Sequence, residues 1–200
     1  NRVFEVDGSN GPIDVNGMTV SGNGEVLLLS DEININGSVV TADSFSAIAG
    51  EEVIVAFDTN NLLQVDISEA LQTTPLDQII TVAETAGIEA GSVTLRAYVS
   101  DAATLAINNT GVVNANGLSI GEVGTISLIG TGGVVRNTGA LDTTSGSNGD
   151  GDILLSAVSV ELGGDLNGGS ASLNMEIGSA GSDAANAGEI GELRVFDDAN

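Results

Sequence analysis

A short alternation of apolar and polar residues recurs along the chain. Its clearest copies read Gly-x-(Val/Ile)-x-Leu-x-(Ala/Gly), at residues 91–97, 124–130 and 151–157. A period of two places every second side chain on one face of a β-strand, so each copy predicts a strand with one buried face. The side chains expected to point inward and to stack on one another are Val93, Leu95 and Ala97, then Ile126 and Leu128, then Ile153 and Leu155.

A turn signal precedes these strands, and its spacing varies. The glycines of successive turns are 20 residues apart from Gly17 to Gly37, 24 from Gly87 to Gly111, and 28 from Gly111 to Gly139. Strands of constant length, joined by turns that absorb insertions, are typical of a β-solenoid rather than of a helical repeat. We therefore predict an all-β fold, a parallel β-solenoid that forms a single domain over residues 1–200.

The turns themselves are rich in Asn-Gly. At Asn16-Gly17 and Asn36-Gly37 we expect the left-handed backbone conformations that tight corners require, and stacked Asn side chains could form hydrogen-bonded ladders. Antiparallel hairpins use the same dipeptide and are the alternative. The longer polar segment inside each unit favours the solenoid.

The repeat is interrupted between about residues 57 and 85. Leu62–Ile67 alternates and predicts a strand that pairs outside the solenoid. Ser68–Leu71 and Pro75–Ile80 could each form about one turn of helix, with Ser68 and Thr74 as N-caps. We expect a short insertion that leaves one face of the solenoid.

The C-terminal part, residues 163–200, is less regular. It is rich in Gly and Ala, and the alternation returns only at residues 188–196. We expect further, less regular rungs there, with a last strand edge that is either a cut or a contact with another subunit.

Composition narrows the class of protein. The chain has 28 acidic residues, four Arg, no Lys, no His and no Cys, and its formal net charge is −24. This charge argues against nucleic acid and anionic membranes as partners and favours cations. Only 2% of residues are aromatic while 42% are hydrophobic, which suits a core of thin layers of Val, Ile, Leu and Ala.

Three stretches resemble the secretion-domain region of two-partner-secretion exoproteins, the family of filamentous haemagglutinin. They are residues 49–57 with Leu62, Leu63 and Val65, residues 86–97, and residues 107–115, and the likeness covers about residues 15–165. The resemblance implies a right-handed parallel β-helix, export through an outer-membrane transporter, and an extracellular or cell-surface location. The Asn-Pro-Asn-Gly motif of that family is missing, since proline occurs only at Pro12 and Pro75.

Reactive groups other than carboxylates are scarce, so we expect no catalysis, no cofactor and no catalytic residue. The acid pairs Asp58 with Asp66, and Asp150 with Asp152, lack the basic residues that hold an acidic sugar in polysaccharide-cleaving enzymes. Residues 148–152, Asn-Gly-Asp-Gly-Asp, could offer oxygen ligands to calcium, but they lack a bidentate Glu and equally suit a solvated turn. Sequons at Asn36 and Asn108 fall in repeat corners, where Asn already has a structural role.

These observations predict a non-catalytic rod segment of a bacterial adhesin or biofilm matrix, binding a host or matrix ligand. The alternative is a filament subunit that polymerises by end-to-end stacking or strand donation. Toxin delivery in contact-dependent inhibition would use the same rod.

Overall fold

The fold is known from a computed structural model, which describes residues 4–7, 11–20, 25–41, 43–57, 63–115, 123–144, 151–168, 173–178 and 192–195. The described residues form strands and turns and contain no helix, so no helix among them could span a membrane. The predicted all-β class is confirmed.

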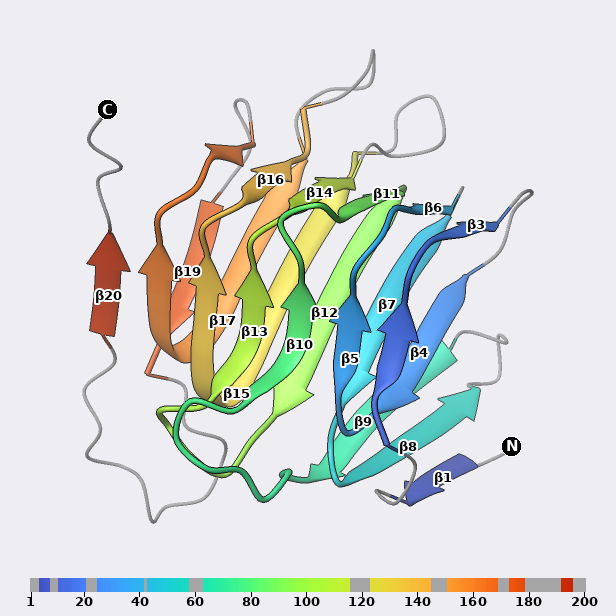
Figure 1. The fold of residues 1–200 in the computed structure, drawn as a ribbon, viewed down its shortest axis with the longest axis vertical. Helices are drawn as coiled ribbons and strands as arrows, with labels where there is room; N and C mark the ends of the chain where they lie inside the picture. Colours follow the sequence, from blue (N-terminus) through green and yellow to red (C-terminus); the bar gives the residue numbers. More distant parts are fainter. Residues whose placement is uncertain are drawn as a thin grey trace.

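Parallel strands pair with their equivalents one circuit further along the chain, and each circuit passes three faces (Figure 1). We call one circuit a rung. Face 1 contains β2 (Ile13–Val15), β5 (Ile33–Ile35), β10 (Gln78–Val82), β13 (Leu105–Asn109), the second parts of β15 (Thr125–Asn137) and β17 (Asp152–Leu162), and β20 (Glu192–Val195).

The other two faces complete each rung. Face 2 contains β3 (Met18–Val20), β6 (Val39–Thr41), β11 (Gly87–Ala90), β14 (Val112–Ala115), β16 (Ala140–Asp142) and β18 (Leu166–Asn167). Face 3 contains β4 (Val26–Ser30), β7 (Ser44–Ala49), β12 (Ser92–Tyr98), the first parts of β15 and β17, and β19 (Leu173–Ile177).

The core lies between the three faces and is built as the alternation predicted. On face 3, Leu95 pairs with Leu128, and Leu128 with Leu155. All three side chains are fully buried. Strands of adjacent rungs lie about 4.8 Å apart, so like side chains form continuous apolar columns along the stack. The parallel pairing also shows that the antiparallel-hairpin reading of the Asn-Gly turns is wrong for these strands.

Two long strands turn a corner without a break. β15 begins on face 3 and ends on face 1, with a register shift between Gly130 and Val134. Gly132 makes this bend, because its φ is +80° and an added Cβ would lie 2.0 Å from the carbonyl oxygen of Val99. Only glycine suits that position.

Most corner glycines serve close packing rather than a left-handed backbone. Gly17 does have a positive φ, +144°, but Gly37 does not, and the left-handed conformation expected at Asn16 and Asn36 is found at neither. A Cβ at Gly37 would lie 2.2 Å from the carbonyl oxygen of Asn16 in the rung below. The expected left-handed turn at Gly37 is therefore wrong, and the residue is small because two backbones meet there.

An Asn ladder does form, one residue before the positions expected. Asn109 Nδ2 donates to Asn137 Oδ1 at 2.6 Å, and both side chains are fully buried. Asn109 Oδ1 accepts from the Gly111 N–H at 3.2 Å, and Asn137 Nδ2 donates to the Gly139 carbonyl at 3.1 Å. The ladder thus satisfies backbone groups at two successive corners.

Removing one member of this ladder should be costly. We expect Asn109→Ala to lower the free energy of unfolding by about 1–3 kcal/mol, because it leaves Asn137 Oδ1 and the Gly111 N–H without partners in a dry corner. Denaturant unfolding measures this loss. Asn114→Ala, at a half-buried outward position of face 2, should cost less than about 0.5 kcal/mol. Equal losses for the two variants would show that the ladder contributes nothing.

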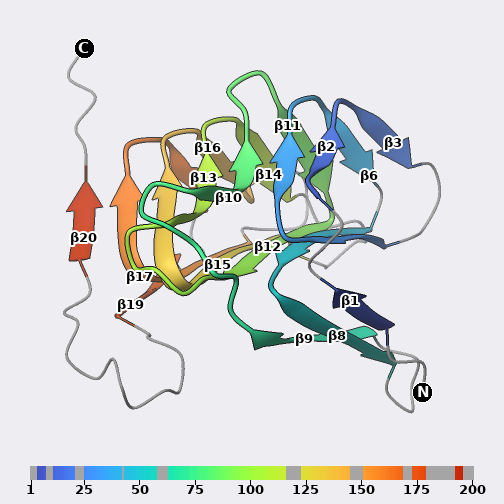
Figure 2. The same cartoon turned by 60° about the horizontal axis from the view of Figure 1, so that its bottom comes forward.

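The insertion is a separate antiparallel sheet. It has the order β1 (Phe4–Asp7), β8 (Glu52–Phe57) and β9 (Leu63–Glu69), and Figure 2 shows it beside the main body of parallel strands. The predicted strand within 62–67 is confirmed as part of β9. A second apolar cluster joins this sheet to the outside of face 3, and it contains Ile48, Val53, Val55 and Ile67 with Leu27, Leu29, Val65 and Tyr98 around them.

The bounds and content of the insertion differ from those predicted. It begins at Glu52, and Gln78–Val82 already belongs to face 1, paired with β5 and β13. The two predicted helical turns are wrong, since Ser68 lies in β9 and Gln78–Ile80 in β10. Of the expected return of alternation over 188–196, residues 192–195 do form a strand on β17. The rest of that stretch lies outside the described residues.

Candidate functional site

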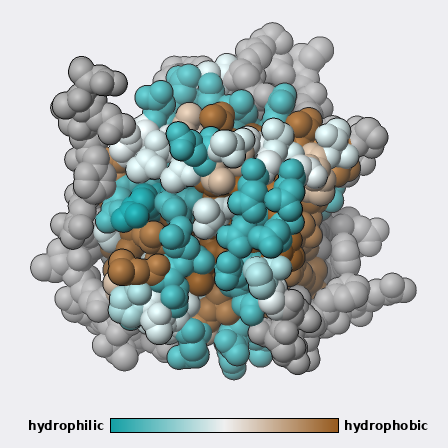
Figure 3. Space-filling view, viewed as in Figure 1, coloured by the Kyte–Doolittle hydropathy of each residue, from teal (hydrophilic) through white to brown (hydrophobic). Residues whose placement is uncertain are grey.

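The outside of face 1 carries a row of polar side chains, one from each rung. In register order the described members are Asp14, Asn34, Thr81, Asn108, Arg136 and Glu161. Figure 3, which views this face, shows hydrophilic residues over much of it with apolar ones between them. The row follows from the strand alternation, which turns every second residue outward.

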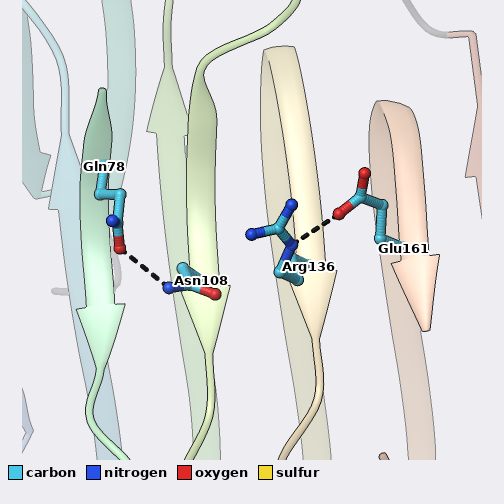
Figure 4. Close-up of polar contacts among 4 residues, drawn as sticks. All are labelled: Gln78, Asn108, Arg136 and Glu161. Carbon is cyan, nitrogen blue, oxygen red and sulfur yellow. Dashed lines mark hydrogen bonds and ion pairs between the residues drawn. The ribbon is translucent and has the colours of Figure 1, made fainter. Parts of the chain in front are cut away.

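Neighbouring rungs are linked through this surface in pairs. Asn34 Nδ2 donates to Asp14 Oδ1 at 3.2 Å. Asn108 Nδ2 donates to Gln78 Oε1 at 2.9 Å, and Arg136 pairs with Glu161 at 2.5 Å (Figure 4). The Asn34–Asp14 and Asn108–Gln78 pairs are exposed and contribute little to stability, whereas Glu161 of the ion pair is buried. Most side chains of this polar row therefore have hydrogen-bond or ion-pair partners.

Of the carboxylate sites weighed from the sequence, only parts are described. Asp58 and Asp150 lie outside the described residues, as does most of 148–152. Asp66 is exposed on β9, and Asp152 is exposed where β17 begins. Among the described residues, no three carboxylates are grouped so that they could hold a metal ion. The calcium hypothesis remains a prediction.

One carboxylate on face 2 has a perturbed acidity. Asp142 Oδ1 accepts from the Thr144 hydroxyl at 2.6 Å and from the Thr144 N–H at 2.8 Å, while Asn167 Nδ2 lies 3.4 Å from Oδ2. The Thr144 hydroxyl bond is the main cause that lowers the pKa of Asp142 below its ordinary value of 3.8, against a smaller opposing effect of burial.

This acidity gives a pH prediction. A carboxyl group whose pKa is lower in the folded state than in the unfolded state stabilises the fold at pH values above its unfolded-state pKa. That stabilisation is lost as the pH falls through the folded-state pKa. We expect Thr144→Val to raise the pKa of Asp142, as measured by carboxyl NMR titration, and to reduce the acid sensitivity of unfolding. Thr81→Val, on face 1, should leave the pKa of Asp142 unchanged. An unaltered titration in Thr144→Val would show that the hydroxyl bond is not the cause.

One cleft is acidic. It has a volume of about 640 Å³ and lies between residues 71–79 and the segments around Asp31, Glu32 and Glu51. Asp77 lines it, and its Oδ2 accepts from the Thr74 N–H at 2.7 Å and the Thr74 hydroxyl at 2.9 Å. The backbone bond from Thr74 is the main cause that lowers the pKa of Asp77. The Asp77 carboxylate therefore stabilises the turn formed by residues 74–77.

A second cleft, of about 260 Å³, lies where the antiparallel sheet meets the outside of face 3. Its lining combines apolar side chains with hydroxyls and one guanidinium, and the residues are Glu25, Val26, Leu27, Ser44, Ser46, Ile48, Val65, Thr94, Arg96 and Ile129. Arg96 occupies an outward position of β12, between Ile48 and Ile129 in register. A cation in a partly apolar cleft is unusual for so acidic a chain.

Sequence reasoning missed Arg96, because the four Arg residues are scattered and no motif surrounds them. The signal was present in the alternation. The outward positions equivalent to Arg96 in the adjacent rungs are Ile48 and Ile129, and outward isoleucines at one level of a face indicate that something covers them.

Comparison with known proteins gives no relative. No known protein family matches the chain, no curated protein is significantly similar to it, and no solved structure matches its fold.

Proposed function

We propose that the chain is a right-handed parallel β-helix of the filamentous haemagglutinin type and acts as a non-catalytic rod segment of a bacterial adhesin or biofilm-matrix fibre. It would lie outside the cell or on its surface, after passage through an outer-membrane two-partner-secretion transporter. Its partner would be a host or matrix ligand, protein or glycan, and not nucleic acid.

The observation that carries this proposal is the stacking of rungs in register on three faces. Because each rung contacts only its neighbours, added rungs lengthen such a stack along a single axis. Residues far apart in sequence, such as Val26, Phe45 and Val93, follow one another along a single column. A shape of this kind supports a role in holding binding surfaces at a distance.

A filament subunit is the second candidate, and the N-terminal rung favours it. Ile13, Met18, Val26 and Leu28 point toward the core but are only partly buried. Their equivalents in the next rung, Ile33, Val39, Phe45 and Ala47, are fully buried. Among the described residues, β2, β3 and β4 pair on one side only. Another rung, from this chain or from a second copy, would cover this end.

One experiment separates the two candidates. The intact mass of the native protein is measured from its source, and the purified protein is viewed by electron microscopy. A very large chain seen as a thin single rod supports the adhesin or matrix role. A mass near the 19.9 kDa of this chain, with long regular filaments, supports the polymerising subunit. A small, compact monomer that binds neither cells nor matrix would refute both.

A further inference from the structure

The cleft between the antiparallel sheet and face 3 is built around an arginine whose donors are largely unused. Arg96 Nη1 donates to the carbonyl oxygen of Val65 at 3.5 Å, which is a long and weak hydrogen bond. Arg96 Nε is buried and has no partner. A guanidinium carries five N–H donors, and a buried donor without a partner is costly. The contact with Val65 therefore uses little of what Arg96 offers.

No acid neutralises Arg96 within the described part of the chain. The ion pair found there joins Arg136 to Glu161 on face 1 instead. Glu25 also lines the cleft. Glu25 precedes β4 and lies four residues before Leu29, which is in register with Arg96 through Ile48. The Cα atoms of Glu25 and Arg96 therefore lie well over 10 Å apart at about 3.3 Å per residue, and no ion pair joins these two described residues. The guanidinium is thus left to an acceptor from outside.

Hydroxyl groups lie beside the guanidinium on neighbouring rungs. Ser46 and Thr94 are register partners on face 3, and Ser44 lies two residues before Ser46. None of the three side chains donates to another described residue. The apolar part of the lining comes from Leu27, Ile48 and Ile129, which lie on the same side of face 3, and from Val65 of the antiparallel sheet. Hydroxyls, one cation and an apolar wall suit a ligand that carries a carboxylate, several hydroxyls and a C–H face.

We propose that this cleft binds a carboxylate-bearing sugar, of the hexuronate class, with the carboxylate on Arg96 and the ring hydroxyls on Ser46 and Thr94. The volume suits about one sugar unit, because it lies just below the usual range of small-molecule pockets, about 300–1,000 Å³. The inference concerns this cleft alone, and it stands whether or not the rod role is correct.

The test is an NMR titration of the whole chain with three probes. D-glucuronate has both the carboxylate and the hydroxyls, D-glucose lacks the carboxylate, and acetate lacks the hydroxyls. Titrations in about 0.15 M salt screen the repulsion from the net charge of −24 beyond about 8 Å. We expect D-glucuronate to bind most tightly, with shifts confined to residues that line the cleft. An equal response to D-glucose or to acetate would overturn the assignment, as would no response to D-glucuronate.

Variants assign the roles within the cleft. We expect Arg96→Gln to weaken D-glucuronate binding by roughly 10- to 100-fold, because hydrogen bonds to charged groups are the strong ones. Thr94→Val keeps Arg96 and its contact with Val65, and should weaken binding by about two- to ten-fold. If Arg96→Gln disturbs the antiparallel sheet, Thr94→Val decides the outcome. Arg136→Gln makes the same change in net charge outside the cleft, and a similar loss in that variant would refute the proposal.

Discussion

Replacing Gly139 by alanine will destabilise the fold by at least about 3 kcal/mol, as measured by denaturant unfolding. A Cβ at this position would lie 1.9 Å from the carbonyl oxygen of Gly111 in the preceding rung and 2.7 Å from the carbonyl carbon of Thr110. Both obstacles are backbone atoms, so no side-chain rotation relieves the overlap. Relief requires the two rungs to move apart.

The hydrogen bonds at this corner prevent such a movement. The Gly139 N–H donates to the Asn109 carbonyl at 3.1 Å, and the Ala140 N–H donates to the Gly111 carbonyl at 2.9 Å. Separating the rungs would stretch both bonds and disturb the Asn109–Asn137 ladder beside them. The cost of the substitution is therefore the overlap together with part of these bonds.

Gly87 is the matched control for this prediction. Gly87 is the first residue of β11 and lies one position past the corner that Gly139 occupies in its own rung. A Cβ there would have no neighbour closer than the Val112 carbonyl oxygen at 3.9 Å, and its φ is not in the left-handed region. Gly87→Ala should change the free energy of unfolding by less than about 1 kcal/mol, in the stabilising direction because alanine restricts the unfolded chain. Similar losses for Gly87→Ala and Gly139→Ala would mean that the close contact between rungs is not the cause.

The apolar columns could be predicted from sequence because one local rule generates them. Alternation with a period of two fixes which side chains point inward, and the glycines before each strand fix the register between rungs. The pairings of Val93 with Ile126 and of Leu128 with Leu155 follow directly. The same rule does not give the hand of the coil, because alternation is identical in a coil of either hand.

The segment before β10 shows why a local signal misled. Thr74 and Asp77 have the spacing of a helix capping motif, and one bond of that motif forms, from the Thr74 N–H to the Asp77 carboxylate. The Thr74 hydroxyl donates to the same carboxylate, and the Asp77 N–H donates to the Thr74 carbonyl at 3.2 Å instead of to the hydroxyl. The next residues, Ile79-Ile80-Thr81-Val82, are β-branched and pair with β5 and β13. The tertiary pairing of these residues outweighs the helical start.

The candidate ligand cleft could not be predicted for a different reason. It is formed by the contact between an insertion and the outer surface of the stack. Val65 of β9 and Arg96 of β12 are 31 residues apart and meet only because the antiparallel sheet folds back over face 3. Sequence alternation marks Arg96 as outward but does not say what lies over it.

Shortening Leu128 to alanine will remove about 2–5 kcal/mol from the free energy of unfolding. Leu128 is fully buried on face 3, between Leu95 and Leu155 of the adjacent rungs. Strand hydrogen bonds fix the distance between rungs, so the column cannot collapse into the space that the side chain leaves. Leu76→Ala makes the same chemical change at a side chain that is 78% exposed, and it should cost less than about 0.5 kcal/mol.

The distribution of the loss distinguishes a stack of rungs from a single globular core. Because each rung contacts only its neighbours, the effect of Leu128→Ala should be greatest in β12 and β17 and weaker in β4, which is separated from β15 by β12 and β7. Native-state hydrogen exchange measures this strand by strand. A uniform loss of protection over all three strands would show that the stack unfolds as one unit, and the nearest-neighbour description of its stability would then be wrong.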